Sequence, residues 1–306
     1  MWDRSGTGGA SRPPATRSDL RLAGLRGPCT QFMNFGATRV LPVRLATWNV
    51  NSLNARMPRV QEWLELADPD VLCMQETKMA DDAFPGLAFE AMGYEWVHNG
   101  QGRWNGVAIL SRVGLDGAAN GFADGREVDP DARIVWATCA GVRVASAYIP
   151  NGRELGHDHY HYKLDWLGRL RSHLEANASA ADPVVVAGDF NVAPADNDVW
   201  DMTAFEGMTH VSEPEREAFL EMVDWGLVDV FRRRWPDDGL YTFWDYQAGR
   251  FHKRQGMRID MVMATEPLAG RATTVLMDRN ARKGEKPSDH APVVVDFDWD
   301  PIHGIR

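Results

Sequence analysis

Residues 133–148 read Arg-Ile-Val-Trp-Ala-Thr-Cys-Ala-Gly-Val-Arg-Val-Ala-Ser-Ala-Tyr, two apolar runs with almost no chain between them. Both runs, Arg133–Thr138 and Val142–Tyr148, are rich in β-branched residues and predict strands. Neighbouring parallel strands need a long crossover connection, usually a helix, and the three residues between these runs cannot supply one. The sequence therefore favours antiparallel or mixed sheets over a doubly wound parallel sheet.

Short apolar runs alternate with amphipathic stretches from Arg44 onward. The apolar runs predict further strands at Arg44–Val50, Val71–Gln75, Gly106–Ser111, Val184–Gly188, Asp260–Ala264 and Val293–Phe297. Helices are expected at about 58–67, at about 162–177, and from Ser212 to Gly226, where Ser212 and Glu215 form a capping box. Strands separated by helices indicate an α/β architecture.

Residues 1–42 differ in composition from the rest of the 306-residue chain. They are rich in Gly, Pro, Ser and Arg and show neither helical nor strand periodicity, so we expect a disordered N-terminal extension. A mis-assigned start codon, with Met33 nearer the true start, explains the segment equally well. We assign no function to this segment.

Composition and net charge indicate which cell compartment and which partners to expect for the protein. Its three cysteines, Cys29, Cys73 and Cys139, are spaced for neither a zinc motif nor a disulfide framework, which favours a reducing cytosol and a cytoplasmic protein. No stretch approaches the roughly 18 apolar residues of a membrane span, so we expect no membrane partner. A net charge of −10 is unfavourable for binding nucleic acid, but a carboxylate-lined metal site is itself acidic until its cation binds.

Acidic and amide residues gather where the predicted strands end. Neighbouring strands lie about 5 Å apart, so side chains at their ends can converge. The residues are Asn49, Asn51, Glu76, Tyr148, Asn151, Asp189 and Asn191, with Asp289 and His290 directly before the last strand. Hard oxygen ligands of this kind suit Mg²⁺. Each residue alone is also an ordinary turn or cap residue, and it is their number that favours a metal site.

Histidines offer two further candidates. His290 titrates near neutrality, and Asp260 is a carboxylate that could fix its tautomer. The histidines at 157, 159 and 161 alternate, which would place them on one face only in a strand. Because they precede a predicted helix, a polar loop that touches phosphate is favoured over a metal site. Walker A, His-Glu-x-x-His and Gly-x-Ser-x-Gly motifs are absent from the sequence.

Eight segments between Arg44 and Phe297 resemble, in order, those of exonuclease III and the abasic (AP) endonucleases of the endonuclease/exonuclease/phosphatase superfamily. They are Thr47–Asn51, Gln75–Lys78, Tyr148–Gly152, Gly188–Asn191, Trp225–Asp229, Tyr241–Trp244, Arg258–Asp260 and Lys286–Pro292. The resemblance implies a four-layer α/β sandwich, in which two mixed β-sheets pack face to face with helices outside. It also implies one catalytic domain over residues 43–300, followed by a tail at 301–306.

The resemblance further implies roles for the residues at the strand ends. Glu76 would be the main ligand of Mg²⁺, or of Mn²⁺ in its place, with Asn49 and Asp289 nearby and Asp189, Asn191 and His290 also at the ion. Asp189 would deprotonate the attacking water, and Asn191 would position that carboxylate and the phosphate. His290, held by Asp260, would donate a hydrogen bond to the phosphate. Tyr148 would contact the phosphate or assist the leaving oxygen.

Substrate contacts are implied in the same way. An apolar pocket for a flipped-out abasic sugar would include Phe243, Trp244, Met257 and Ile259. Asn151 would bind a phosphate oxygen, and the DNA backbone would contact Lys78, Arg103, Trp104, Arg133 and Arg153. Ordinary core aromatics and plain surface charges are the alternatives for these two groups.

The implied function is a Mg²⁺-dependent DNA phosphodiesterase of base excision repair. It would cut 5′ to abasic sites, leave a 3′-hydroxyl, and act on duplex DNA as a 3′–5′ exonuclease that trims 3′ ends, working as a monomer. One alternative is a related phosphodiesterase or phosphatase for RNA or another phosphoester. Another is a non-catalytic nucleic-acid binding protein on the same fold.

Overall fold

The structure, a computed structural model, describes residues 42–299. The predictions of a disordered extension at 1–42 and of a tail at 301–306 therefore fall outside the described residues, apart from Pro42. Among the helices of residues 42–299, none combines the length and the apolar character needed to cross a bilayer.

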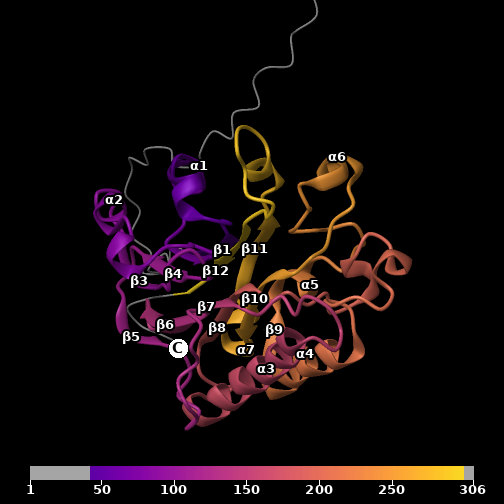
Figure 1. Cartoon of the computed structure of the whole chain (residues 1–306). Helices are drawn as coiled ribbons and strands as arrows, with labels where there is room; N and C mark the ends of the chain where they lie inside the picture. Colours follow the sequence, from indigo (N-terminus) through magenta and orange to yellow (C-terminus); the bar gives the residue numbers. More distant parts are fainter. Residues whose placement is uncertain (1–41, 300–306) are drawn as a thin grey trace, which may run out of the picture. The chain divides into compact units, whose positions relative to one another are not determined.

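Two six-stranded mixed sheets form the centre of the described part (Figure 1). The first sheet has the order β11-β12-β1-β2-β4-β3, with β1 Val43–Asn49, β2 Val71–Gln75, β3 Glu95–Asn99, β4 Val107–Ser111, β11 Ala272–Met277 and β12 Val293–Phe297. The second has the order β5-β6-β7-β8-β10-β9, with β5 Asp116–Asn120, β6 Ile134–Cys139, β7 Val142–Tyr148, β8 Val184–Asp189, β9 Leu227–Asp229 and β10 Asp260–Thr265. Only the pairs β1–β2 and β7–β8 are parallel, so the prediction of mixed sheets is confirmed.

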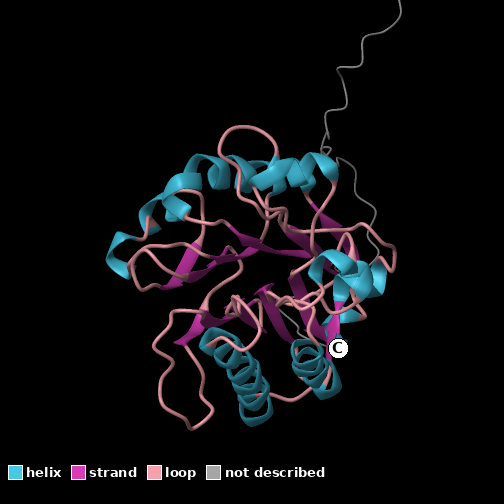
Figure 2. Ribbon diagram, turned by 45° about the vertical axis from the view of Figure 1, so that its right-hand side comes forward, coloured by secondary structure: helices cyan, strands magenta, loops and turns pink. Residues whose placement is uncertain are grey.

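Helices cover the outer face of each sheet, which gives four layers (Figure 2). The longer helices are α1 Leu53–Ala67, α3 Asp158–Asn177 and α4 Glu213–Trp225. The shorter helices are α2 Gly86–Glu90, α5 Val230–Arg234, α6 Arg250–Lys253 and α7 Glu266–Ala269. Single 3₁₀ turns lie at Asp81–Ala83, Asp196–Asp198, Met202–Phe205, Gln247–Gly249 and Arg279–Arg282.

The apolar residues fill the spaces between these layers. Leu45 and Ile109 of the first sheet belong to one buried cluster with Val144 and Val185 of the second, so the sheets pack face to face. A second cluster joins the other face of β7 and β8 to α3 and α4, and a third joins the first sheet to α1 and α2. The predicted four-layer sandwich is therefore confirmed.

Two helices begin earlier than predicted because side chains and strand ends cap them. The helix expected from about residue 58 starts at Leu53, whose N–H donates to the carbonyl oxygen of Thr77 at 3.0 Å. The helix expected from about 162 starts at Asp158, because the ring of His157 accepts the N–H of His159 at 3.0 Å. His157 is thus a helix cap. The predicted capping box of Ser212 and Glu215 is confirmed.

Candidate active site

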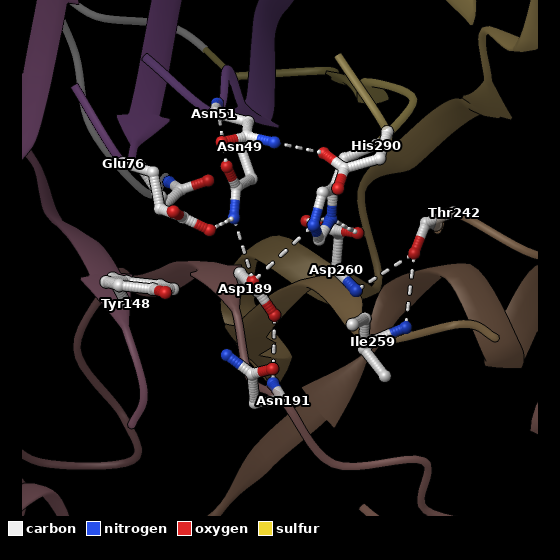
Figure 3. A network of polar contacts seen from close by, with 12 residues as sticks. Asn49, Asn51, Glu76, Tyr148, Asp189, Asn191, Thr242, Ile259, Asp260 and His290 are labelled. Atoms are coloured by element: carbon white, nitrogen blue, oxygen red, sulfur yellow. Dashed lines mark hydrogen bonds and ion pairs between the residues drawn. The ribbon is translucent and has the colours of Figure 1, made fainter. Parts of the chain in front are cut away.

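The ends of strands from both sheets bring the predicted polar residues together (Figure 3). Asn49 ends β1 and pairs in register with Gln75, so Glu76 directly follows at the same edge. In the second sheet, Asp189 at the end of β8 lies opposite Asp260 and beside Tyr148. His290 precedes β12, whose N-terminal end lies beside β1. Residues separated by about two hundred positions therefore meet in one place.

Asn49 connects the two sheets through one amide group. Its Nδ2 donates to Oε1 of Glu76 at 2.8 Å and to Oδ2 of Asp189 at 2.9 Å. The second oxygen of Asp189 accepts the N–H of Asn191 at 2.9 Å. Ligand atoms of Glu76, Asp189 and His290 all lie within 4.8 Å of one another. The carboxylates are thus held at fixed positions, one on each sheet.

His290 and Asp260 form a buried ion pair behind Asp189. Nδ1 of His290 lies 2.8 and 3.0 Å from the two carboxylate oxygens of Asp260, and Nε2 lies 3.9 Å from Oδ2 of Asp189. Asp260 is anchored in turn by Thr242, whose hydroxyl oxygen accepts the N–H of Asp260 at 3.0 Å. This arrangement directs Nε2 of His290 toward Asp189.

These contacts set the charges at neutral pH. Burial alone would lower the pKa of His290, but Asp260 and Asp189 raise it to about 10, so the ring carries a proton. Burial raises the pKa of Asp189 to about 7, although the nearby His290 cation opposes the shift. A protonated ring offers no lone pair to a metal, so the geometry favours His290 as a hydrogen-bond donor over the predicted metal ligand.

Lys78 neutralises the carboxylate of Glu76. Its Nζ lies 2.7 Å from Oε2 of Glu76 and donates to Oδ1 of Asn51 at 2.5 Å. Asn51 in turn donates to Asp289 at 3.0 Å. Burial would raise the pKa of Glu76, but the ammonium group of Lys78 brings it below its usual value. The carboxylate is therefore ionised at neutral pH and able to hold a cation.

Tyr148 keeps its proton at neutral pH. Burial, together with Glu76, raises its pKa well above the usual value. The guanidinium of Arg133 lies 4.9 Å from the centre of the Tyr148 ring and is paired with Asp131 at 2.8 Å. Because Arg133 is 7% exposed, it supports the tyrosine from behind and does not present the predicted surface charge for a DNA backbone.

A cleft of about 500 Å³ opens over this cluster. Its walls contain the predicted residues Asn151, Arg153, Phe243, Met257 and Ile259, together with Lys78 and Asp289. The prediction for Trp244 needs correction. This residue is 1% exposed and packs with Tyr241 and Ala291, so it belongs to the core and does not line the cleft. Its backbone N–H donates to the carbonyl oxygen of Asp289 at 3.0 Å.

Arg103 and Trp104 lie apart from the cleft walls. Trp104 is 63% exposed, and the guanidinium of Arg103 lies 5.8 Å from the centre of its ring. Neither residue is among those that line the cavity. Their exposed position leaves the predicted contact with DNA untested.

Sequence reasoning missed an apolar wall of the cleft. Trp200, Phe205 and Met208 line it, and all three come from the irregular segment that follows β8. This segment has no strand or helix periodicity that would have assigned its aromatic residues to a site. The position of this segment shortly after Asp189 and Asn191 in the sequence could have indicated that it lies near the site.

Sequence reasoning also missed a buried cation behind the site. Nζ of Lys163 donates to the carbonyl oxygen of Asn191 at 2.6 Å and forms an ion pair with Glu215, and both side chains are fully buried. His210 lines the cleft, with Nε2 3.2 Å from Oδ1 of Asn191. Burial and Lys163 lower the pKa of His210 to about 3, so the ring is neutral. Lys163 lies at helical spacing from the apolar residues Trp166, Leu167 and Leu170. This spacing places Lys163 on the buried face of the helix and could have predicted its burial.

The donor set fits a hard divalent cation. Glu76 and Asp189 contribute carboxylate oxygens, and Asn49 adds an amide beside both. Carboxylate and carbonyl oxygens suit Mg²⁺ and Mn²⁺. In the part of the chain that the structure describes, Glu76, Asp189 and His290 are the one group of three acidic, histidine or cysteine residues close enough to share an ion. The predicted alternative at the histidines 157, 159 and 161 therefore does not form such a group.

Comparison with known proteins identifies the family. The sequence model of the endonuclease/exonuclease/phosphatase family matches residues 46–290. The chain belongs to this family. Exodeoxyribonuclease III of Haemophilus influenzae is 31% identical over 270 residues, which cover 83% of this chain and 100% of that protein. Family membership confirms the resemblance inferred from the eight segments.

Solved structures of family members share the fold. An AP endonuclease from Archaeoglobus fulgidus is 37% identical, with a TM-score of 0.81 over 84% of this chain and 99% of that one. The 3′ phosphatase NExo from Neisseria, solved bound to a product DNA hairpin, is 38% identical, with a TM-score of 0.80 over 84% of this chain and 100% of that one. The chain is accordingly an enzyme, a hydrolase of phosphodiester bonds.

Proposed function

We propose that this enzyme is a Mg²⁺-dependent DNA phosphodiesterase of base excision repair. It would cut 5′ to abasic sites, leave a 3′-hydroxyl, and remove nucleotides and blocking groups from the 3′ ends of duplex DNA. The proposal depends on one observation above all, the meeting of Glu76, Asp189 and His290 at the base of the cleft. The names of the relatives, which include an exodeoxyribonuclease, an AP endonuclease and a 3′ phosphatase, support DNA as the substrate.

A single site can serve these reactions because each breaks a bond between phosphorus and a 3′ oxygen. Asp189 would take the proton of the attacking water, and its pKa of about 7 places it close to neutral pH for this task. Its two oxygens are oriented by Asn49 and by the backbone of Asn191. The water oxygen would bond to phosphorus as the 3′ oxygen leaves.

Two protonated side chains, His290 and Tyr148, would contact the phosphate group when DNA is bound. His290 carries a proton on Nε2 and would donate it as a hydrogen bond to a phosphate oxygen. Tyr148 keeps its proton and would donate it toward the leaving 3′ oxygen. Glu76 would hold the cation, with Asp289 nearby, and the amide nitrogen of Asn49 would orient the carboxylate of Glu76. When bound, the cation offsets the negative charge that builds up on the phosphate.

The predicted apolar pocket residues, which lie in the cleft beside the apolar wall described above, support the preference for an abasic sugar. Phe243, Met257 and Ile259 lie together on one side of the cavity, where a sugar without a base could be enclosed. The same residues would also contact a terminal 3′ nucleotide. We further propose that the enzyme acts as a monomer in the cytoplasm.

The test uses the full-length protein and three 5′-labelled duplexes, which carry an abasic site, a 3′-phosphate, or no damage. We expect Mg²⁺-dependent cutting of the first and removal of phosphate from the second, both abolished by a chelator. Asp189→Asn should reduce both rates by about 10³-fold because it removes the base and keeps the shape. Asp165→Asn is the matched control, since Asp165 only forms an exposed ion pair with Arg126.

The alternatives give different outcomes in the same assay. A rate on RNA that exceeds the rate on all three duplexes would favour the related phosphodiesterase. DNA binding without any hydrolysis in Mg²⁺ or Mn²⁺ would favour the non-catalytic protein. Full activity of Asp189→Asn would contradict the proposed mechanism.

A further inference from the structure

Glu76 adopts a backbone conformation that its own side chain disfavours. Its φ angle is 53°, and Lys78, two residues later, also has a φ of 53°. Residues with a Cβ rarely enter this left-handed region because Cβ approaches the following carbonyl oxygen. Such conformations persist only where surrounding contacts fix them. Thr77 lies between the two strained residues, so contacts made by Thr77 can hold Glu76 in this conformation.

Thr77 is fixed by its backbone and by its side chain. Its N–H donates to the carbonyl oxygen of Gly106 at 3.1 Å, and its own carbonyl accepts the N–H of Leu53 at 3.0 Å. Its hydroxyl lies 2.8 Å from Nε2 of His98. A Cβ on Gly106 would lie 2.1 Å from this hydroxyl, so the space for it is closely fitted. Thr77 is fully buried.

His98 is held on its other side by Asp81. Nδ1 of His98 lies 2.8 Å from Oδ1 of Asp81, and the ring stacks on Phe84 with 4.4 Å between ring centres. Nδ1 is close to this carboxylate without an aligned hydrogen bond to it. A neutral ring with its proton on Nδ1 leaves Nε2 free to accept the hydroxyl of Thr77. The order Thr77, His98, Asp81 resembles a nucleophile with its base. Because the hydroxyl of Thr77 is buried, however, it cannot reach a substrate.

We infer that Thr77 and His98 are positioning residues for Glu76. Their hydrogen bond fixes the peptide between two left-handed residues and so directs the carboxylate of Glu76 toward Asp189 and His290. Without the hydroxyl, residues 76–78 can relax to a commoner conformation, and the carboxylate then moves away from the other ligands. The inference rests on the proposed metal site at Glu76, and it adds the residues that determine how well this site binds its cation.

The test compares Thr77→Val, which removes the hydroxyl and keeps the shape, with Thr77→Ser, which keeps the hydroxyl. Mn²⁺ binding to the full-length protein without DNA is measured by calorimetry. We expect Thr77→Val to bind Mn²⁺ at least 10-fold more weakly and Thr77→Ser to stay within about 3-fold of the wild type, as for partners of metal ligands elsewhere. Equal affinities of wild type and Thr77→Val would overturn the inference, as would equal losses in the two variants.

A double variant separates positioning from a general loss of stability. Thr77→Val leaves Nε2 of His98 buried without a partner, whereas Thr77→Val/His98→Leu removes both polar groups and should recover most of the thermal stability. We expect Mn²⁺ affinity to stay weak in this double variant. Affinity that recovers together with the melting temperature would overturn the inference. Because no DNA is present, a wild type that binds Mn²⁺ without cutting DNA contradicts the proposed function alone.

Discussion

Asp260 does not line the cleft, yet it determines the charge of a residue that does. It is fully buried, and its carboxylate supplies the largest interaction that raises the pKa of His290. Burial opposes this effect, so the ring would lose its proton near neutral pH without the partner. The sequence showed both residues and suggested their pairing. It could not show that the pairing leaves Nε2 directed at Asp189, because that follows from the register of β8 and β10.

Replacing Asp260 by Asn should therefore change the pH dependence of the reaction. In the wild type, the folded-state pKa of about 10 keeps His290 protonated throughout the neutral range. In Asp260→Asn the pKa should fall to near or below its usual value, about 6.5. Since both proteins share the base Asp189, we expect the ratio of the variant's kcat/KM to that of the wild type to fall from pH 6 to pH 8, reaching about 10⁻² at pH 8.

The pH profile of kcat/KM on the abasic duplex measures this effect. Thr242→Ser is the control, because its hydroxyl can still accept the N–H of Asp260. Parallel profiles for Asp260→Asn and the wild type would show that the charge of His290 does not matter for the reaction.

At the scale of single residues, burial decided which sequence predictions failed. Arg133 was predicted to contact the DNA backbone and Trp244 to line the apolar pocket, and both are buried inside the protein. Lys163 was not predicted near the site at all, since a lysine is seldom fully buried. Local sequence gives the type of a side chain, but its exposure depends on which elements pack against it.

At the scale of elements, strands with buried faces were predictable and edge strands were not. The bounds of β2, β7 and β12 agree with the prediction, because their runs are apolar on both faces. The strand β5 reads Asp-Gly-Ala-Ala-Asn and is fully exposed, so its sequence carries no strand signal. The site residues could be predicted without the edge strands, because they lie at the ends of central strands.

The contact between α3 and α4 contains a buried ion pair that should contribute strongly to stability. Replacing Lys163 by Met would leave the carboxylate of Glu215 buried without its cation. The loss of one partner of such a pair costs about 3–5 kcal/mol, and we expect Lys163→Met to lose that much free energy of unfolding. Chemical denaturation of the two proteins measures the difference.

The matched control is the double variant Lys163→Met/Glu215→Gln. Gln keeps an oxygen for the hydroxyl of Thr209 and the N–H of His210 but carries no charge. The double variant should regain about 1 kcal/mol or more relative to Lys163→Met. A single variant that loses less than about 1 kcal/mol would show that the pair is not ionised in the folded protein.

At the scale of the whole molecule, the negative net charge of the protein is unfavourable for binding its proposed substrate, DNA. The chain carries a formal charge of −10, whereas DNA binding usually depends on many cationic contacts. Among the residues that line the cleft, the cationic ones are Lys78, Arg153, Arg250 and the protonated His290. A small number of cations near the site implies that few phosphates are neutralised when DNA binds. The remaining affinity would then come from the divalent ion and from the apolar wall.

Salt titration tests this view of binding. We expect the logarithm of the affinity of Asp189→Asn for duplex DNA, measured by fluorescence anisotropy in Mg²⁺, to fall with the logarithm of salt with a slope of about −3. Arg153→Gln should make the slope shallower by about 1. Arg233→Gln serves as the control, since Arg233 is paired with Glu266 outside the cleft. A slope of about −6 or steeper would point to a wider cationic surface than the cleft provides.

Because the amide of Asn49 bridges the two sheets, the geometry of the active site depends on the distance between them. One nitrogen atom bonds a carboxylate on each sheet, and the apolar side chains between the sheets set how far apart those carboxylates stand. A bulkier residue packed between β1 and β8 would push the two sheets apart and stretch one of the two bonds. Substitutions at these positions should therefore alter catalysis as well as packing unless they conserve volume.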